Sequence, residues 1–561
     1  MTHLKQQRGA LGIFTMLTLL MAVLFAALAV DTGRLLMEQR RLQSVADMAA
    51  LDAASAAGSC GSGNLSDAES VAAASATRNN HSGLPLDVDV GTISVGAGGI
   101  REFSATAATL ATAVSVTASK TVPASLFAGG MIGTNTTLNA NAVAERQAIA
   151  GFSAGTTLVS LSNSEAALLN NLFTGILGAP VALDVLSYQG IAATQLSLLE
   201  LVNASAGIGS VSELLASDLT LLQLFNLYAD AVSASDVADV AVANGMDALI
   251  AATVGSLNAN VGDILDVTSQ NPEDAANAEL NLFDLIMTSA LVANGTAAID
   301  LPLAVNLPAG LLNTTTQLTV TQAPQIAIGP PGRGEDGNWR TQMRTSQVDL
   351  QTNLQSNINL TILGLAGVNA NVDLALQVQV AQGQAWLQSI QCARVNDNNS
   401  VVTIGAQPGV AAINLGEASD PAATSASISV SANVLLLGNV PVADVAVGLN
   451  APLQNPSSTS LEYLYNPNNG NVLPQVQTAT TAPGLAISNI PQNLTVQVSP
   501  LGLPIDLGGL GDAIVGQILT PLISALGTTL IDPLLSLLGI EIGSMDVRLV
   551  SVDIQRPEMK R

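Results

Sequence analysis

The sequence predicts an α+β protein: an N-terminal transmembrane helix and helical stalk, followed by a mixed, β-rich exported domain with Leu/Ala-rich helical insertions. Three patterns support this fold class. Residues 9–30 form an uncharged apolar run, a Leu/Ala-rich stretch with helical spacing follows residue 156, and segments such as residues 372–380 alternate apolar and polar side chains. Helical and strand segments come in blocks, which favours α+β over the regular alternation of a parallel α/β sheet.

The apolar run is long enough to be a membrane helix. It lies between the charged residues Arg8 and Asp31, and its 22 residues, at about 1.5 Å each, span a hydrocarbon core of about 30 Å. We expect a retained anchor whose boundaries are marked by Arg8, Gly9, Val30, Asp31 and Arg34. The alternative is a cleaved signal peptide with Ala-Leu-Ala at residues 27–29, although the apolar region of a signal peptide is shorter, about 7 to 15 residues.

Charge indicates on which side of the membrane the rest of the chain lies. Basic residues flank both ends of the run, so they do not fix its orientation. Only Lys5 and Arg8 of the 17 basic residues precede the run, which leaves 15 against all 42 acidic residues in 31–561, a balance of −27. Such an acidic mass suits an exported domain, and we expect a single-pass protein with a cytoplasmic N-terminus.

The segment after the run continues as good helix formers and carries an apolar stripe. Leu35, Leu42, Val45 and Ala49 recur at spacings of seven, three and four residues. We expect one helix over residues 11–57, about 70 Å long. Its stripe is either a stalk interface, as in pilin-like subunits whose helices bundle, or one face of a rigid spacer or of a helix lying on the membrane.

Later segments alternate between helical and strand patterns. The helical stretch contains no Lys or Arg from Gln147 to Gly332, against sixteen acidic residues, so we expect these acids on solvated helix faces rather than in salt bridges. Residues 513–531 form an uncharged run of 19 that we interpret as part of a core helical hairpin, with a second membrane segment as the alternative. Strands with one polar face, which favour an antiparallel sheet, are expected around residues 87–90, 114–117, 372–380, 428–430, 494–498 and 546–553.

Gly-rich stretches at residues 58–63 and 329–337 divide the chain. The expected regions are a membrane anchor and amphipathic stalk helix (1–57), a small β-rich region (58–155), a Leu/Ala-rich helical region (156–328), an antiparallel β-rich region (338–500), and a C-terminal helical hairpin with a closing strand (501–561).

Composition excludes most chemistry. Only 11% of residues are charged, there are two His and two Cys, and the net charge is −25. We therefore expect no enzyme, no catalytic residue, no cofactor, no metal site and no nucleic-acid partner. The triplet Asp31-Thr32-Gly33 resembles an aspartic-protease loop but closes a membrane helix, so we interpret it as an interfacial helix end. Acidic turns at residues 335–338 and 396–399 lack the spacing of a calcium loop and are expected to be solvated.

Motifs of the first 155 residues resemble those of a known family. The order RGALGIFTMLTLLMAVLFAALAVDTGRLLMEQRRLQSVADMAALDAA, VDVGTIS, AVSVTASKTVPASLFAGGMIG and NANAVAERQAIAGFSAG resembles the TadG-like proteins associated with tight-adherence (Tad/Flp) pilus loci. The resemblance implies a membrane-anchored bacterial protein of the inner membrane with a periplasmic domain. No D-x-S-x-S metal motif occurs, and the fifth position after Gly9 or Gly12 is not Glu, so neither metal-dependent adhesion nor processing as a major pilin is implied.

Together these patterns predict a non-catalytic envelope protein, a structural or assembly component associated with Tad/Flp-type pili. Its expected partners are the inner-membrane lipid bilayer and other envelope or pilus-assembly proteins. The alternative is a periplasmic binding module for an apolar ligand such as lipid, which a mean hydropathy of +0.44 suggests. Cys60 and Cys392 are either a disulfide pair, or a buried Cys392 with an exposed Cys60, or a source of intermolecular bridges through Cys60.

Overall fold

A computed structural model gives the fold. It describes residues 8–56, 65–95, 101–106, 111–126, 135–154, 161–235, 240–269, 272–301, 313–334, 336–362, 365–392, 399–423, 425–434, 438–449, 457–466, 470–480, 494–501, 509–539 and 543–560.

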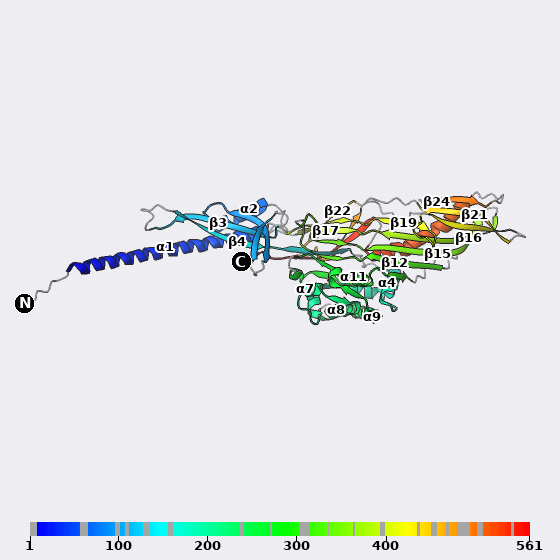
Figure 1. Ribbon diagram of the computed structural model, residues 1–561, viewed down its shortest axis with the longest axis horizontal. Coiled ribbons are helices and arrows are strands. Elements are labelled where there is room, and N and C mark those ends of the chain that lie inside the picture. Colours follow the sequence, from blue (N-terminus) through cyan, green and yellow to red (C-terminus); the bar gives the residue numbers. More distant parts are fainter. Residues whose placement is uncertain are drawn as a thin grey trace, which may run out of the picture.

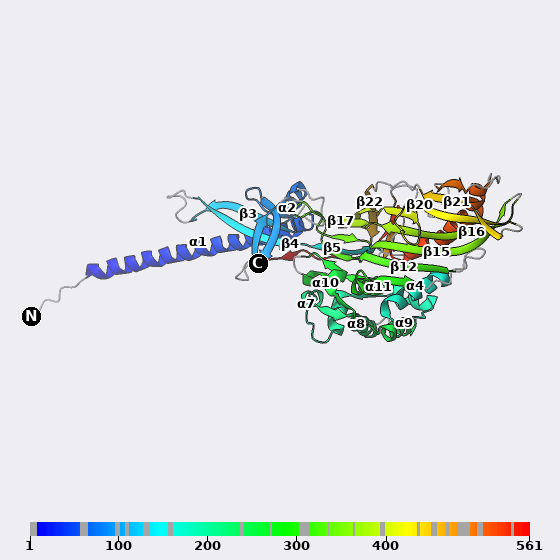
Figure 2. The same cartoon turned by 45° about the vertical axis from the view of Figure 1, so that its right-hand side comes forward.

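The molecule is elongated, with its N-terminal helix at one end and a long β-sheet at the other (Figure 1). Helix α1 (Arg8–Ala54) is continuous for 47 residues, or about 70 Å. Its first half projects away from the body, while its second half lies along a small sheet (Figures 1 and 2). The prediction of one long helix through the apolar run and the stalk is therefore confirmed.

The small sheet and helix α2 (Leu65–Arg78) form an N-terminal domain around the second half of α1. Alanines dominate the contact between the two helices, and these small side chains let the helices approach closely; Ala46, Ala49 and Ala53 of α1 and Ala68 and Ala72 of α2 are completely buried. Neighbouring strands of the sheet are, in order, β2 (Arg101–Ala105), β1 (Asp87–Val95), β3 (Ala113–Pro123), β4 (Asn135–Glu145) and β26 (Glu558–Met559). The last strand comes from the C-terminus, so the end of the chain returns to the N-terminal domain.

Two further sheets share a buried core in the middle of the molecule. The first has the order β23 (Gln475–Thr480), β25 (Ser544–Ile554), β5 (Ala148–Ala154), β13 (Ile326–Gly329) and β9 (Leu265–Val267). The second has the order β14 (Gln342–Arg344), β17 (Gln384–Gln391), β18 (Ser400–Gln407) and β22 (Thr459–Tyr465). Strand β5, which the sequence groups with the N-terminal region, belongs to this middle part because it is buried almost throughout and pairs with β25.

The Leu/Ala-rich stretch folds into short helices around a central helix, α11 (Leu282–Asn294), whose first ten residues are all buried. Ser162, Ser197 and Thr220 begin three of the helices with capping boxes, so the polar residues of this stretch set its helix boundaries. The other helices are α4 (Asn163–Leu177), α5 (Val185–Ala193), α6 (Leu198–Ala204), α7 (Val211–Leu215), α8 (Leu221–Ala234), α9 (Val240–Ala252), α10 (Val261–Ile264) and a 3₁₀ turn (Pro272–Ala275). Two short strand pairs brace them, β6 (Gln195–Ser197) with β10 (Glu279–Asn281) and β7 (Asp218–Thr220) with β8 (Asn258–Asn260).

A long antiparallel sheet forms the end of the molecule that lies farthest from α1 (Figure 1). Its central strands β15 (Gln347–Ile362) and β16 (Leu365–Val380) are 16 residues each and carry the predicted alternation of apolar and polar side chains. Around them lie β11 (Ala298–Leu301), β12 (Asn313–Gln322), β19 (Ala411–Gly416), β20 (Ser425–Val434), β21 (Gly438–Leu449) and β24 (Leu494–Pro500).

The C-terminal apolar run packs against this sheet as one helical run, and the predicted helical hairpin is wrong. Helices α12 (Leu510–Ile514), α13 (Thr520–Leu526) and α14 (Asp532–Leu537) are joined without a turn by π-helical segments at Val515–Leu519 and Gly527–Ile531. Pro521 and Pro533 each lie at the second residue after a π-helical segment. The last residues of these segments, Leu519 and Ile531, keep right-handed helical backbone angles, so the prolines do not break the run.

Among the described residues, two helices are long and apolar enough to span a membrane, α1 and the C-terminal run. The apolar window of α1 is fully exposed, whereas half of the C-terminal window is buried in the body. The outward side of the C-terminal run is polar, with Asp512, Gln517, Thr528 and Thr529 exposed. This run is thus a core helix of the body, and the α+β fold class predicted from the sequence is confirmed.

Candidate functional site

The end of the apolar run is where α1 meets the folded N-terminal domain. Large apolar side chains from Ile13 to Val30 are at least 52% exposed, whereas the next residue, Asp31, is only 8% exposed. The Asp31 carboxylate accepts a hydrogen bond from the Ser125 hydroxyl and another from the backbone N–H of Leu126 at 2.9 Å. These bonds, together with the charge of Arg34, hold the pKa of Asp31 below its ordinary value. The first charge after the apolar run is therefore fixed to the chain that follows β3.

Two more charged side chains of α1 continue this attachment along β3. The Arg34 guanidinium donates a hydrogen bond to the carbonyl of Pro123. One turn further on, Glu38 Oε2 lies 2.9 Å from Lys120 Nζ, and the hydrogen bond from this ammonium lowers the pKa of Glu38. Both side chains of the pair are about three-quarters buried, so solvent screens them less than a surface pair.

Two glutamines of α1 cover the part of the outer edge of β4 that β26 leaves unpaired. Gln39 donates to the carbonyl of Asn139 at 2.7 Å, and Gln43 donates to the carbonyl of Asn141 at 2.9 Å. Residues four apart on a helix rise about 6 Å, and residues two apart on a strand rise about 6.8 Å, so the two spacings match. The side chains of α1 thus replace the strand that would otherwise pair with this edge.

The predicted stalk stripe lies inside the N-terminal domain. Leu42, Val45 and Ala49 are buried against the sheet and α2, and Leu35 is half-buried. They are therefore not available as an interface for bundling with other subunits, and the expectation of a free stalk, spacer or surface-lying face is wrong for them. The cause is tertiary: the same stripe that suits a bundle also suits a sheet, and the sheet follows in the same chain.

The remaining boundary residues take the following places. Helix α1 begins at Arg8, and nothing beyond the helical backbone is described for Arg8 and Gly9. Residues 31–33 are helical rather than part of a strand-to-loop turn, and Thr32 donates to the Leu28 carbonyl within the helix at 2.7 Å. The Asp31-Thr32-Gly33 triplet therefore has an anchoring geometry and not that of a protease loop.

In a comparison with known protein families, two family models match the N-terminal part of the chain, which contains α1 and the small sheet. The family model described as Flp pilus-assembly TadE/G-like matches residues 9–56, and the model described as Tad-like Flp pilus-assembly matches residues 53–144. The N-terminal region thus carries Tad-family pilus-assembly domains. No curated protein and no solved structure matches the chain.

The two Tad matches coincide with a structural unit. The first covers almost all of α1, and the second covers α2 and strands β1 to β4. Every hydrogen bond described above between α1 and another element joins the segment of the first match to the segment of the second. In this chain the Tad region is therefore one domain with the second half of α1 built into its core.

A second polar site, in the body, was missed by the sequence analysis. Asp284 of α11 and Arg548 of β25 are both buried, with Asp284 Oδ2 lying 3.4 Å from Arg548 Nη1, and Ser153 of β5 donates to Asp284 at 2.6 Å. The expectation that all acids of the helical region face solvent is thus wrong for Asp284. A lone acid within the apolar sequence LFDLIMTSALVAN, and an Arg among the apolar residues of β25, are the signals that point to such a pair.

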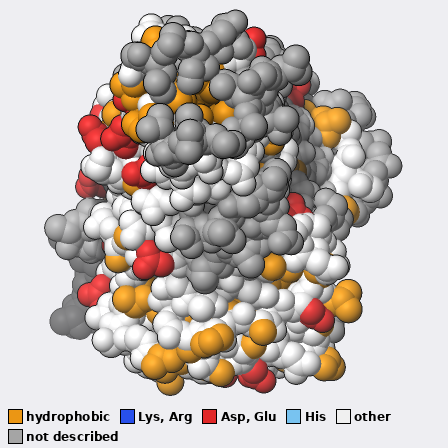
Figure 3. Space-filling view, turned by 90° about the vertical axis from the view of Figure 1, so that its right-hand side faces the viewer, with side chains coloured by type: hydrophobic (Ala, Val, Ile, Leu, Met, Phe, Trp, Pro, Cys, Tyr) orange, Lys and Arg blue, Asp and Glu red, His pale blue; other side chains and the backbone are white. Residues whose placement is uncertain are grey.

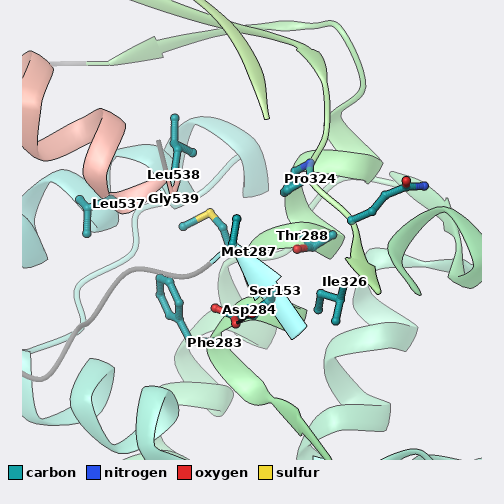
Figure 4. A pocket seen from close by; sticks show the side chains of 12 residues that line it. Ser153, Phe283, Asp284, Met287, Thr288, Pro324, Ile326, Leu537, Leu538 and Gly539 are labelled. Carbon is teal, nitrogen blue, oxygen red and sulfur yellow. Dashed lines mark hydrogen bonds between the residues drawn. The ribbon is translucent and has the colours of Figure 1, made fainter. Parts of the chain in front are cut away.

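Ser153 and Asp284 of this group border a small cavity (Figure 4). The cavity has a volume of about 20 Å³ and is also lined by Phe283, Met287 and Leu538. Burial raises the pKa of Asp284, while Arg548 and Ser153 act in the opposite direction. A space of this size holds about one water molecule and no substrate. The ion pair is therefore a structural link between the helical region and the C-terminal strand.

A larger open pocket of about 320 Å³ lies between α11, the end of β12 and β14. Its wall includes Asp263, Gln322, Gln325, Arg344 and Gln382 beside a few apolar side chains. This polar lining does not suit a lipid chain, which an apolar pocket binds. The apolar surface of the long sheet is instead covered by the C-terminal helical run.

The other sequence-derived candidates fall partly outside the described residues. Cys392 is buried and is not a free thiol, whereas Cys60 lies outside the described residues, so their pairing stays a prediction. Glu335 and Asp397 of the acidic turns also lie outside. Asp336 accepts two hydrogen bonds from Asn338, which lower its pKa and close the turn locally.

Proposed function

We propose that the chain is a non-catalytic, membrane-anchored component of the bacterial envelope that serves the assembly or structure of Tad/Flp-type pili. Helix α1 holds it in the inner membrane with its N-terminus in the cytoplasm, and the body extends into the periplasm. The observation that carries this proposal is the coincidence of the Tad matches at residues 9–144 with a folded domain into which the apolar helix is fixed.

The junction between α1 and the N-terminal domain is rigid. This favours a protein that holds its domain in a fixed position over one that tethers a freely moving domain. The hydrogen bonds between α1 and the domain begin at the first residue after the apolar run and continue without an intervening linker. They involve Asp31, Arg34, Glu38, Gln39 and Gln43. The position and direction of the domain are thus set by the membrane helix. Such an arrangement suits a protein that presents a surface at a fixed height above the membrane.

The charge of the body favours a protein as the partner that binds at the end farthest from α1. Viewed end-on, the face farthest from α1 shows acidic and apolar side chains and no basic ones among the described residues (Figure 3). Phosphate-rich partners need clustered Lys and Arg. This face therefore suits another envelope protein and not nucleic acid.

Deletion of the gene followed by complementation tests the proposed function. Surface pili are counted by electron microscopy in cells that carry the full chain, a chain without residues 9–30, or a chain in which these 22 residues are replaced by a Leu/Ala run of equal length. We expect piliation to fall on deletion and to return with the full chain and with the Leu/Ala run, but not without an apolar run. Unchanged piliation in the deletion strain would contradict the proposal.

A further inference from the structure

We propose that the chain that directly follows β3 makes a second membrane contact, with Leu126 inserted at the headgroup boundary beside the point where α1 leaves the bilayer. The inference rests on the proposed anchoring of α1 in the membrane. It adds a lipid-binding residue that is 95 positions away from Asp31 in the sequence.

The contacts between α1 and the end of β3 show that the strand runs toward the membrane. Lys120 is bound to Glu38, Pro123 to Arg34, and Leu126 to Asp31. As β3 and the residues after it advance, their partners on α1 therefore move back, residue by residue, toward the apolar run. Both ribbon views show β3 and β4 lying along α1 in the direction of its N-terminal half (Figures 1 and 2).

Leu126 lies at the level of Asp31, the first residue after the apolar run of α1. Its backbone N–H is bound to the Asp31 carboxylate, and its side chain is 59% exposed. Val30, the neighbour of Asp31 in α1, is 52% exposed and belongs to the segment that faces lipid. A leucine fixed beside this position lies in the same layer, because an interfacial apolar side chain is buried about 5–10 Å into the boundary between headgroups and acyl chains.

Charge and polarity of the surroundings suit that layer. No charged residue occurs in the sequence between Lys120 and Glu145, so Leu126 has no charged neighbour within five residues along the chain. Asp31 and Arg34, the charges nearest to Leu126, are already bound to atoms of β3 or of the chain that directly follows it. On α1, exposed apolar side chains continue past Asp31 to Leu36 and Met37, so an apolar outer face extends more than one turn beyond the run.

We commit to lipid as the occupant because the Leu126 position is continuous with the surface of α1 that the bilayer covers. A partner protein at this point would have to displace lipid from the side of an inserted helix. The second contact would fix the tilt of the N-terminal domain, because two points on one rigid domain then touch the membrane.

The test places an environment-sensitive fluorophore at single positions of the full chain in lipid vesicles. Leu126→Cys is labelled with an NBD maleimide, and the unsubstituted protein treated alike gives the background from the native cysteines. Leu501→Cys is the matched control in water. Leu501 is 47% exposed and directly follows β24, which lies at the end of the molecule opposite α1. Leu20→Cys, within the apolar run, is the control in lipid. Quenching by lipids with a nitroxide near the headgroup is then measured.

We expect the quencher lipid to lower the emission at residue 126 about two-fold or more, with little change at residue 501. Emission at residue 126 that behaves like that at residue 501 would overturn the inference while leaving the anchoring of α1 intact, provided residue 20 is in lipid. Emission at residue 126 that is blue-shifted but not quenched would also overturn it, since it would show a protein covering. A residue 20 in water would overturn the anchoring itself, and the inference with it.

Discussion

Arg548 of β25 and Asp284 of α11 form a buried ion pair at 3.4 Å although 264 residues separate them in the chain. Arg548 is also the cross-strand neighbour of Ser153, which donates to the same carboxylate. One interaction thus joins three elements that are remote in sequence. It also supplies a cation to a part of the chain, residues 147–332, that has none of its own.

Loss of Arg548 is expected to destabilise the body strongly. Arg548→Met leaves the Asp284 carboxylate buried without its cation, which costs about 3–5 kcal/mol of unfolding free energy. Urea unfolding followed by the fluorescence of Trp339 and Trp386 measures the change. The double variant Asp284→Leu/Arg548→Met should recover most of the loss, and the exposed Arg556→Met should stay within about 0.5 kcal/mol of the parent. A single variant as stable as the parent would show that the pair does not link these elements.

The pair between Glu38 and Lys120 predicts a pH dependence of the anchor junction. Its hydrogen bond lowers the pKa of Glu38 below 4.5 in the folded state, so its contribution is present above that value and is lost as the pH falls through the lower, folded pKa. Lys120→Met should reduce the hydrogen-exchange protection of β3 amides near pH 7 by up to about five-fold, corresponding to about 1 kcal/mol.

The difference between Lys120→Met and the parent should shrink as the pH falls below 4.5. Glu69→Gln, an exposed position on α2, should leave β3 protection unchanged at every pH and serves as the control. A difference that is equally large at both ends of the pH range would mean that Lys120 acts through packing and not through the charge of Glu38.

Packing of the stalk stripe inside the N-terminal domain predicts sensitivity to overfilling. Ala49 is completely buried between α1, α2 and the sheet, so Ala49→Leu should destabilise this domain by about 1–3 kcal/mol. Hydrogen exchange of β3 and β4 in the dilute, detergent-solubilised chain measures the loss. Met48→Leu, at a neighbouring position that is 49% exposed, should change little. If Ala49→Leu left the domain intact but abolished a cross-link to another subunit, the stripe would be an intermolecular interface.

The two cysteines predict a covalent link between the linker after α1 and the β-rich middle of the molecule. Since Cys392 is not a free thiol, we expect no maleimide labelling of the denatured, non-reduced monomer and two labels after reduction. Two labels without reduction would exclude the intramolecular bond. A reducible dimer band would assign the bridge to Cys60 of two chains.

Features that depend on local periodicity were predictable from the sequence. The apolar run and its helical continuation fixed α1 correctly, and the alternation at residues 372–380 located β16. Both signals reflect the burial of one side of a regular element, which neighbouring residues in the chain report. The predicted C-terminal hairpin is wrong for the opposite reason, because the run around Pro521 continues as one helix through π-helical segments, and no local period reports whether such a run turns back.

Features that depend on pairing across the chain were not predictable. The boundary residues of the anchor were named from the sequence, but the partners of Asp31, namely Ser125 and the Leu126 amide, lie 94 and 95 positions away. Nothing in the spacing of the polar residues of α1 indicates that they bind the edge of a strand. The stripe through Leu42 predicts either a bundling interface or one face of a spacer or surface-lying helix, whereas it packs against the chain's own sheet.

The orientation of α1 is the measurement that tests the central claim most directly. Alkaline phosphatase, which is active only after export, is fused after Arg561 in one strain and before Met1 in another, and its activity is measured in membrane and soluble fractions. The account predicts activity for the fusion after Arg561 alone, retained in the membrane fraction and lost from it when residues 9–30 are removed. Activity for the fusion before Met1, or activity of the C-terminal fusion in the soluble fraction of the unaltered chain, would contradict a retained anchor with an exported body.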